Sequence, residues 1–488
     1  MTKSSDRKLK VLFVASEVAP LVKTGGLADV AGALPAALAA LGIDVRILLP
    51  GYPQVIAGLK SRGRAAVLPS LPGVPPAQLL ASKHPSGVQL LVIECAIYDR
   101  AGGPYMDASG RDWPDNDLRF GLLSYVAALL ASPSTPFAWN PDILHCNDWQ
   151  TGLGPAYLRY AEGATAKTVF TVHNLGYQGV FPLDTAARLG LPPQASAVDG
   201  IEYYGKMSFL KAGLQYADQI TTVSPTYARE IQTPELGMGL HGLLGHRRDV
   251  LSGILNGIDV DAWDPDNDPY IERYYNASRL AHKEDNRRAL RTRMGLADVQ
   301  ELPLFAAIGR LTEQKGQDVL AEIVPELVAL PAQFALLGSG DETLQSQFQA
   351  LAERYPGQVA VHIGFDEGLS HQIEAGADIF VMPSRYEPCG LNQMYSQRYG
   401  TPPVVHATGG LCDSVVDVTP QTLAAKTASG FQFAPLTARN LLEACKRAAD
   451  SYRNKRVWRQ IQKNGMARDF SWEASADAYR RLYQRLLG

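Results

Sequence analysis

Residues 10–42 read KVLFVASEVAPLVKTGGLADVAGALPAALAALG, and this stretch decides the class of fold. The apolar run over residues 10–18 predicts a buried strand, and KTGGL predicts a glycine-rich loop. The alanine-rich segment that follows predicts a helix that Gly42 can end, with a kink or break at Pro35. Strand, loop and helix in this order form the repeating unit of a parallel α/β sheet.

The same alternation recurs along the rest of the chain. The first half contains DVRILLP (44–50), VQLLVIEC (88–95), DILHCND (142–148) and TVFTVHN (168–174). After Asp264-Pro265 the pattern restarts with LPLFAAIGRL (302–311), AQFALLGSGD (332–341), QVAVHIGFD (358–366), ADIFVMPS (377–384) and PPVVHATGG (402–410). Short, fully apolar strands separated by helical segments predict parallel sheets. We therefore expect an α/β protein with two doubly wound domains.

Two further segments have a recognisable character. Residues 259–275 are rich in Asp, Pro and Asn, which predicts a linker between the domains. Near the end of the chain, Ser471 can cap a helix whose apolar face would consist of Ala474, Ala478, Tyr479, Leu482 and Leu486.

The bulk composition excludes several classes of function. The chain has 488 residues, of which 46% are hydrophobic and 19% charged, and its net charge is −3. This suits two large globular domains and offers no basic surface for nucleic acid. The five cysteines are scattered without C-x-x-C spacing, so we expect neither disulfides nor a zinc site, and a cytoplasmic location. The uncharged stretch 120–141 contains three prolines, which predicts a buried helix and a loop and no membrane span.

Glycines and cations follow the first strand of each predicted domain. In doubly wound sheets, ligands bind beyond the carboxyl ends of the strands. In KTGGLADV (23–30), Gly25 and Gly26 would let an anion approach the backbone, and Lys23 adds a positive charge. In GRLTEQKG (309–316), Arg310 and Lys315 suit a diphosphate. The alternatives are a tight turn with a solvated lysine and, in the second motif, two surface charges.

Other polar groups lie where later strands end. In SRYEPCGL (384–391), Glu387 precedes a rigid Pro-Cys-Gly turn, and a carboxylate there could bind sugar hydroxyls or stabilise positive charge on a sugar ring. The alternative is a solvated loop glutamate. HATGGLCDSV (406–415) could offer backbone N–H groups to phosphate, or form a tight turn. HCNDWQTG (145–152), TVHNLGYQG (171–179) and LNGID (255–259) supply Asp148, His173 and Asn256, although buried histidines are more often structural.

The combination and order of these motifs resemble the bacterial glycogen synthase and plant starch synthase family of retaining glycosyltransferases. KTGGLADV, TVHNLGYQG, VSPTYARE, LNGIDVDAWDP, GRLTEQKG and SRYEPCGLNQMYS carry the resemblance, which extends to FSWEASADAY near the C-terminus. It implies the GT-B fold, in which two Rossmann-like domains face each other with the active site in the cleft between them. The first domain would cover 1–255, completed by a helix at 471–488, and the second would cover 256–470.

The resemblance also implies residue roles. Lys23, Gly25 and Gly26 would bind the nucleotide sugar, with Asp29 supporting that loop or the sugar. Arg310 and Lys315 would hold the diphosphate, and Glu387 would bind the transferred glucose. The remaining expected site residues are Cys389, Gly390 and the backbone of Thr408, Gly409, Gly410 and Leu411 in the donor pocket, and Asp148, His173 and Asn256 around glucose and acceptor.

The implied reaction transfers glucose from ADP-glucose to the 4-hydroxyl of an α-1,4-glucan (glycogen or a malto-oligosaccharide), with retention of configuration. Same-face substitution and a short-lived covalent intermediate both remain open. Two departures affect details. Bacterial members often read H-A-H-D-W-H where this chain has residues 145–150, so Asn147 and Gln150 replace the second and third histidines and Cys146 replaces the alanine. Tyr395 stands where the wider superfamily carries a glutamate for the ribose. The alternatives are a non-catalytic glucan-binding protein and another GT-B enzyme that uses UDP-glucose. A nicotinamide dehydrogenase is disfavoured because G-x-G-x-x-G follows neither domain's first strand.

We expect no metal and no cofactor. Four Asp-x-Asp pairs are metal candidates by spacing: Asp115 with Asp117, Asp259 with Asp261, Asp264 with Asp266, and Asp266 with Asp268. Acidic residues in loops are usually turn formers, and the predicted cations already neutralise a diphosphate.

Overall fold

The computed structural model describes residues 7–299 and 301–488, which form two compact units. The first unit contains the described residues up to Val223, together with Ala228–Gly257 and Trp472–Gly488. The second contains Ser224–Tyr227 and Ile258–Ser471. Residues 1–6 of the predicted first domain, and residue 300 of the second, lie outside the described chain. Each unit has a sheet with helices on both faces, which confirms the predicted α/β class with two Rossmann-like, doubly wound domains.

The first unit is built on a nine-stranded sheet in the order β12-β11-β7-β6-β1-β2-β5-β4-β3. Its strands are β1 (Lys10–Val14), β2 (Asp44–Pro50), β3 (Gly63–Val67), β4 (Ala77–Lys83), β5 (Gln89–Cys95), β6 (Ile143–Asn147), β7 (Lys167–Val172), β11 (Gln219–Thr222) and β12 (Leu251–Gly253). From β12 to β5 neighbouring strands are parallel, as predicted, whereas β4 is antiparallel to both β5 and β3. A separate antiparallel sheet consists of β8 (Val180–Pro182), β10 (Lys206–Ser208) and β9 (Glu202–Tyr203).

The helices of the first unit follow the strands in chain order. They are α1 (Gly26–Ala40), α2 (Pro53–Gly58), α3 (Asn116–Leu130), η1 (Trp149–Thr151), α4 (Leu153–Arg159), α5 (Thr185–Arg188), η2 (Pro193–Ser196), α6 (Phe209–Tyr216), α8 (His241–His246), η3 (Arg248–Val250) and α18 (Trp472–Leu487), while α7 (Pro225–Glu230) begins within the segment assigned to the second unit. Helix α1 runs through Pro35 without the predicted break and ends before Gly42, whose φ is +87°. The strand predicted for 10–18 ends at Val14, because Val18 pairs with Val22 in a turn.

The second unit is built on a parallel sheet in the order β15-β14-β13-β16-β17-β18. Its strands are β13 (Leu304–Leu311), β14 (Gln333–Gly340), β15 (Val359–Ile363), β16 (Ile379–Met382), β17 (Pro403–His406) and β18 (Phe431–Phe433). Its helices are η4 (Leu280–His282), α9 (Lys283–Met294), η5 (Glu313–Lys315), α10 (Gln317–Ala329), α11 (Glu342–Arg354), α12 (Glu367–Gly376), α13 (Asn392–Arg398), α14 (Gly409–Ser414), α15 (Pro420–Ala424), α16 (Ala438–Arg453) and α17 (Lys455–Met466).

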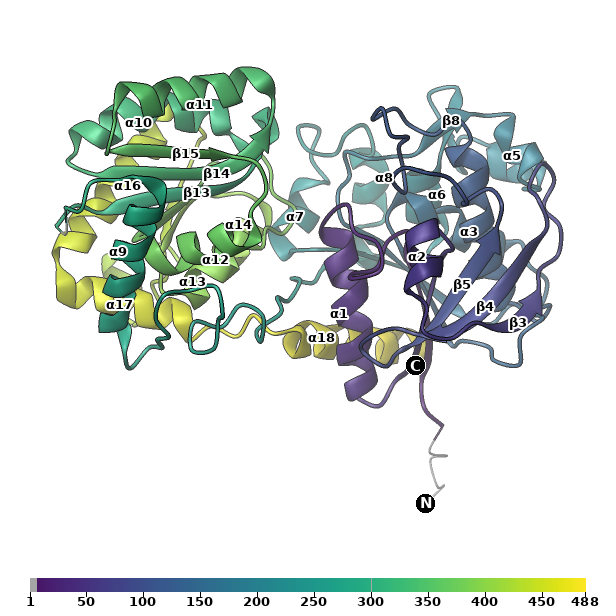
Figure 1. Ribbon diagram of the computed structural model, residues 1–488. Coiled ribbons are helices and arrows are strands. Elements are labelled where there is room, and N and C mark those ends of the chain that lie inside the picture. Colours follow the sequence, from purple (N-terminus) through teal and green to yellow (C-terminus); the bar gives the residue numbers. More distant parts are fainter. Residues whose placement is uncertain (1–6, 300) are drawn as a thin grey trace. The chain divides into compact units, whose positions relative to one another are not determined.

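Apolar side chains lie on both faces of this sheet, which explains why a layer of helices covers each face. Along β14, Phe334 and Leu336 pack toward α10, α11 and α16, whereas Ala335 and Leu337 pack toward α9 and α12. Figure 1 shows α10 and α11 on one side of β13–β15 and α12 on the other. Because successive side chains of a strand point to opposite faces, an uninterrupted apolar run needs a helix layer on each. Full burial of each large apolar side chain stabilises the fold by roughly 1.5–3 kcal/mol.

The segment 259–275 is an ordered part of the second unit, so the predicted linker is wrong. Tyr275 is fully buried, and its hydroxyl donates to the carbonyl of Tyr399. Asp268 is also buried and bonds to His371 and Tyr399. Trp263 stacks on His371 with their ring centroids 3.9 Å apart. The composition of the segment indicated exposed turns, but a few large side chains anchor it in the core.

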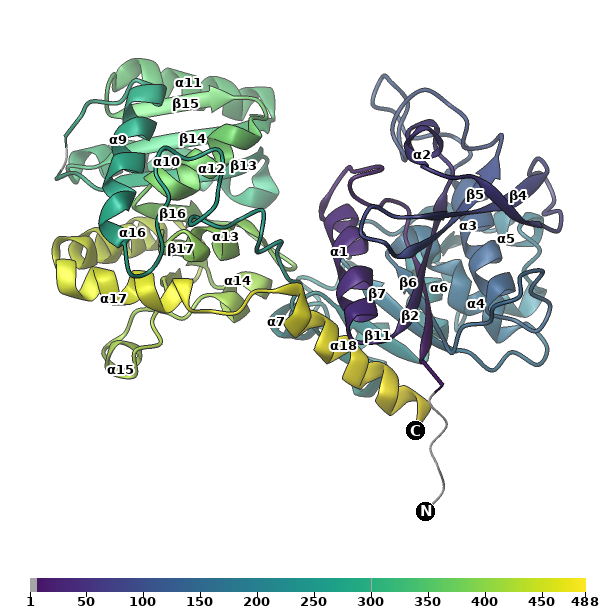
Figure 2. The ribbon, with the colours of Figure 1, turned by 60° about the horizontal axis from the view of Figure 1, so that its bottom comes forward.

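Helix α18 returns to the first unit and lies alongside α1 (Figure 2). Its buried face includes Tyr479 and Leu482 as predicted, but the rest of it consists of Trp472, Ser475, Ala476 and Tyr483. Ala474 is exposed, and Ala478 and Leu486 are only half-buried, because the larger rings of Trp472 and Tyr483 set the stripe. Within residues 7–299 and 301–488 no helix is both long and apolar enough to cross a membrane.

Candidate functional site: two half-sites at the strand ends

The loops that follow β1 and β6 meet at one point of the first sheet. These two strands are neighbours, but the chain proceeds from β1 toward β2 on one side and from β6 toward β7 on the other. Such a reversal of strand order opens a crevice at the carboxyl ends of the strands, where ligands of doubly wound sheets bind. Lys23, Gly25 and Asp29 follow β1, Asp148 follows β6, and His173 follows β7. The structure therefore places these predicted residues at the same sheet edge.

The loop before α1 has space where side chains are missing. Within the described chain, a Cβ added to Gly25 or Gly26 would meet no atom within 4 Å, and the φ of Gly25, −150°, is one that any residue adopts. Folding therefore does not require glycine at these positions. Glycines that the fold does not need are expected where a ligand approaches the backbone closely. Lys23 is more than half exposed, and its ammonium pairs with Asp29 in the first turn of α1 at 2.7 Å. Asp29 thus supports the lysine directly.

Asp148 and His173 are joined through the backbone. Asp148 has φ +57° and accepts hydrogen bonds from the amides of His173 (2.7 Å) and Asn174 (3.4 Å) on the same oxygen. Burial raises the pKa of Asp148 to about 7 against these bonds, and the charge of Glu17 adds to the rise. An aspartate with positive φ at a strand end is a costly conformation that favours a functional position.

His173 is a neutral imidazole with a defined tautomer. Burial lowers its pKa to about 3. The amide nitrogen of Asn147 donates to the carbonyl of Val14, which turns its oxygen toward His173, so that His173 Nε2 donates to Asn147 Oδ1 at 3.0 Å. Nδ1 is then the acceptor nitrogen. His173 Nδ1 is therefore suited to accept a hydrogen bond from a hydroxyl group of a ligand.

The other two polar residues of these motifs differ in their surroundings. Asn256 is largely buried in the segment that follows β12, the edge strand of the sheet. His145 lies in the core between the hydroxyls of Tyr483 (2.7 Å) and Thr171 (2.6 Å), and burial lowers its pKa to about 3. His145 is therefore structural.

The second unit has its own reversal of strand order, between β13 and β16. Lys315 follows β13 in η5, and Glu387 follows β16. The Lys315 ammonium and Glu387 Oε2 form an ion pair at 2.5 Å, and the Ser384 hydroxyl donates to the same oxygen at 3.0 Å. Arg310, near the end of β13, is exposed and takes part in none of the ion pairs found within the described ranges. A cation, a nearly buried carboxylate and an exposed guanidinium thus lie at one sheet edge.

Gly409 and Gly410 have a packing role that Gly25 and Gly26 lack. A Cβ on Gly409 would lie 2.0 Å from the carbonyl oxygen of Glu387, and one on Gly410 would lie 2.0 Å from that of Cys389. The amide of Gly410 donates to Glu387 O (3.0 Å), and the amide of Leu411 donates to Thr408 O (3.1 Å). These glycines therefore hold the Glu387 turn against α14. The amide of Thr408 also donates, to His406 O at 2.9 Å, so three of the four amides predicted for a phosphate are occupied within the protein.

The turn itself is fixed from several sides. Gly390 has φ +72°, and the side-chain amide of Gln393 donates to the carbonyls of Cys389 (3.1 Å) and Gly390 (3.0 Å). Ser224 Oγ donates to Pro388 O at 2.7 Å. Cys389, which the resemblance places in the donor pocket, is buried in this turn. The backbone around Glu387 is thus rigid before any ligand arrives.

Residues that the sequence analysis missed lie beside the predicted ones. Glu17, 3% exposed, accepts from the amides of Thr24 (2.5 Å) and Gly25 (3.1 Å), and from the hydroxyl of Tyr105 (2.8 Å). Burial raises its pKa despite these bonds. A glutamate directly after a buried strand was the signal in the sequence, but only the fold shows its partners.

The acidic pairs are engaged with nearby protein groups. Asp115 pairs with Arg100, Asp266 with Arg279, Asp264 with Arg398, and Asp268 with His371. Asp117 lies near Arg188, and Asp259 accepts from the amides of Asp261 and Ala262. Within the part of the chain that the structure describes, no group of three or more His, Cys, Asp or Glu side chains could hold a metal ion.

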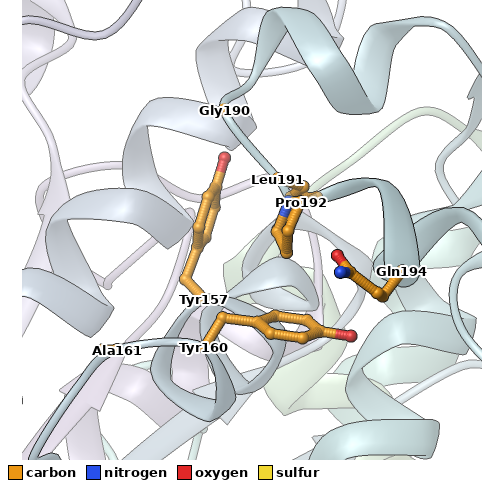
Figure 3. Close-up of a pocket in the computed structure, with 7 residues that line it drawn as sticks. All are labelled: Tyr157, Tyr160, Ala161, Gly190, Leu191, Pro192 and Gln194. Atoms are coloured by element: carbon orange, nitrogen blue, oxygen red, sulfur yellow. The ribbon is translucent and has the colours of Figure 1, made fainter.

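A pocket of about 650 Å³ lies elsewhere in the first unit (Figure 3). Tyr157 and Tyr160 line it from the C-terminal end of α4, with Pro192 and Gln194 opposite. A helix that follows a parallel strand runs back toward the amino edge of the sheet, so this pocket is remote from the strand ends. The hydroxyl of Tyr157 donates to Leu189 O and that of Tyr160 bonds to Tyr216, and none of the predicted site residues is among those described as lining the pocket.

Comparison with known proteins assigns the chain to a class and then to a family. A family model described as "Starch synthase catalytic domain" matches residues 10–246, and one described as "Glycosyl transferases group 1" matches residues 293–461. The catalytic domain of starch synthase IV from Arabidopsis thaliana, solved with ADP and acarbose, superposes with a TM-score of 0.85 at 33% identity, over 99% of this chain and 100% of that one. The chain is thus a glycosyltransferase of the GT-B class.

Curated relatives define the family more narrowly. The glycogen synthase of Nitrosomonas eutropha is 56% identical, with 100% of this chain and 98% of the relative covered. That of Nitrosomonas europaea is 54% identical, with 100% of both chains covered. The chain belongs to the glycogen synthase family.

Proposed function

We propose that the protein transfers glucose from ADP-glucose to the non-reducing 4-hydroxyl of an α-1,4-glucan, with retention of configuration. The observation that carries the proposal is the Lys315–Glu387 pair at the β13–β16 reversal. A cation for a leaving diphosphate and a carboxylate for a sugar lie there on neighbouring loops. The starch synthase solved with ADP and acarbose supports the same donor and acceptor classes.

The proposed roles follow from charge and position. Arg310, Lys315 and Lys23 bind the diphosphate and stabilise its growing negative charge as the glucosyl C1–O bond breaks. Glu387 accepts hydrogen bonds from glucose hydroxyls, which requires Lys315 to shift toward the phosphate. Asp148, His173 and Asn256 contact glucose and acceptor. Residues of both units act on one donor molecule in this scheme, so each half-site alone is inactive.

The proposed chemistry is same-face substitution. The acceptor O4 bonds to C1 on the face that the diphosphate leaves, and the O4 proton passes to a departing phosphate oxygen, so that the products are ADP and a glucan longer by one residue. The competing scheme needs a protein nucleophile. Lys315 and Ser384 both bond to one oxygen of Glu387, and one oxygen of Asp148 accepts from two backbone amides. Neither carboxylate is therefore free to act as the nucleophile. Cations replace a metal in this proposal.

The decisive experiment measures incorporation of labelled glucose into glycogen from ADP-glucose and from UDP-glucose, side by side. We expect strong preference for ADP-glucose and α-1,4-linked products. Comparable turnover with UDP-glucose would overturn the donor assignment. Binding of glycogen without transfer from either donor would make the protein a non-catalytic glucan-binding member of the family.

A further inference from the structure

The carboxylate of Glu17 occupies the start of the donor loop. Strand β1 ends at Val14, and Glu17 turns its side chain back under KTGGL, where Oε2 accepts from both Thr24 N and Gly25 N. These amides directly precede α1, where unpaired N–H groups would otherwise attract an anion. The loop's anion position is thus filled by a side chain of the protein itself.

Glu17 is in turn held by Tyr105. The Tyr105 hydroxyl donates to Glu17 Oε1 at 2.8 Å and lies 2.8 Å from the Ser16 hydroxyl. Since the single tyrosine proton goes to the carboxylate, Ser16 is the donor in the second bond. Both oxygens of Glu17 therefore have partners, and the carboxylate has one orientation.

The segment that carries Tyr105 is fixed by a buried arginine. Arg119 is 1% exposed and forms no ion pair within residues 7–299 and 301–488. Its guanidinium donates to Pro104 O and Asn116 Oδ1, both at 2.8 Å, and Asn116 Nδ2 donates to Tyr105 O at 2.9 Å. Burying a charge costs free energy unless hydrogen bonds satisfy it. The bonds that satisfy the Arg119 guanidinium also fix the backbone on either side of Tyr105.

We infer that Glu17 is the positioning residue of the donor loop, holding the backbone at Thr24 and Gly25 so that Lys23 and the open space at Gly26 face the diphosphate. The inference rests on the proposed function. Because Glu17 already occupies the amides of Thr24 and Gly25, Lys23 and not these amides supplies the first unit's contact to the diphosphate. Gly25 and Gly26 then serve by leaving room, in agreement with the open space around both.

Two substitutions separate positioning from a direct role in catalysis. Glu17→Gln keeps an oxygen that can accept from both amides but removes the charge, whereas Glu17→Ala removes the acceptor. Tyr105→Phe removes only the bond that orients Glu17, and serves if Glu17→Ala does not fold. Glu162→Ala, which removes an exposed glutamate in the same unit, is the control.

The first readout is hydrogen exchange of the Thr24 and Gly25 amides in the full-length protein, which does not depend on activity. We expect exchange about tenfold or more faster in Glu17→Ala, less so in Tyr105→Phe, and near that of the unmodified protein in Glu17→Gln and the control. Unchanged exchange in Glu17→Ala would overturn the inference.

The second readout separates KM from kcat. In Glu17→Ala we expect the KM for ADP-glucose to rise about tenfold while the KM for glycogen stays constant, and Glu17→Gln to restore most of the loss. A Gln variant as inactive as Ala, with protected amides, would show that the charge acts directly and would overturn positioning. If the unmodified protein transfers no glucose from ADP-glucose, the proposed function fails, and the exchange measurement still decides whether Glu17 holds the loop.

Discussion

At the scale of the residue, Glu387 uses one carboxylate oxygen for both Lys315 and Ser384. We expect Glu387→Gln and Glu387→Ala to lower transfer at least about 100-fold, because a preorganised group that meets charge in the transition state contributes that much or more. The fold should survive, since the Lys315 side chain is 21% exposed and its ammonium can rehydrate. Glucose incorporation and thermal melting measure the two effects.

The matched control is Glu313→Gln in the loop that carries Lys315, because the Glu313 side chain is 83% exposed. It should leave transfer unchanged. Near-normal turnover of either Glu387 variant would remove Glu387 from the site.

The raised pKa of Asp148 makes a second prediction at this scale. Its pKa of about 7 lies above the unfolded value near 3.8, so folding favours the protonated form. That contribution is fully present below the unfolded-state pKa and is lost as the pH rises through 7. In Asp148→Asn, which keeps an acceptor oxygen, we expect stability relative to the unmodified protein to rise between pH 4 and 7, with a slope approaching about 1.4 kcal/mol per pH unit.

Urea unfolding of both proteins from pH 4 to 8 measures this difference. Parallel stability curves across that range would show that Asp148 titrates alike in the folded and unfolded chains.

Some site residues could be predicted from the sequence, and others could not. The sequence predicted Lys23, Arg310, Lys315 and Glu387 as site residues because each is a charged residue that follows a buried strand. Of these four, Glu387 is the one that the variants above test. Glu17 was overlooked because its meaning depends on Tyr105, which is far along the chain. Only folding brings the two together.

At the scale of the element, two glycine pairs at similar strand–helix junctions should respond oppositely to substitution. Gly410→Ala places a methyl group 2.0 Å from a backbone carbonyl and should destabilise the protein by about 2 kcal/mol or more. Gly25→Ala meets open space, so stability should hold while the KM for ADP-glucose rises. Thermal melting and donor titration of the two variants check this.

Equal destabilisation by both variants would contradict the distinction between packing glycines and ligand-facing glycines. An unchanged KM in Gly25→Ala would mean that the open space is not used by the donor.

Most buried strands were predictable because fully apolar runs bounded by polar residues leave few alternatives. The exceptions have physical reasons. Strands β3 and β4 form an antiparallel edge, where one face is exposed and the apolar run is broken. Strands β11, β12 and β18 have only four, three and three residues, too few to give a clear apolar run. The supposed linker failed because composition does not report burial, and Trp263, Ile271 and Tyr275 anchor it.

At the scale of the whole molecule, the proposed cations lie in both units while the acidic pairs are engaged with nearby groups. We expect full transfer activity after exhaustive treatment with EDTA, because Lys23, Arg310 and Lys315 would neutralise the leaving diphosphate. Glucose incorporation before and after treatment measures this, with re-addition of Mg²⁺ and Mn²⁺ as the control. Activity that is lost and then restored by either ion would contradict the proposed mechanism.

The return of α18 to the first unit has a consequence for the protein's synthesis. The nine-stranded sheet leaves the ribosome early, but the helix that covers α1 and supplies Tyr483 to His145 leaves only after the whole second unit. Until then the nascent chain carries an uncovered apolar face, and the His145 imidazole has Thr171 but lacks the hydroxyl of Tyr483. The first unit to be translated is thus the last to be finished, and for that interval it is a natural client for chaperones near the exit tunnel.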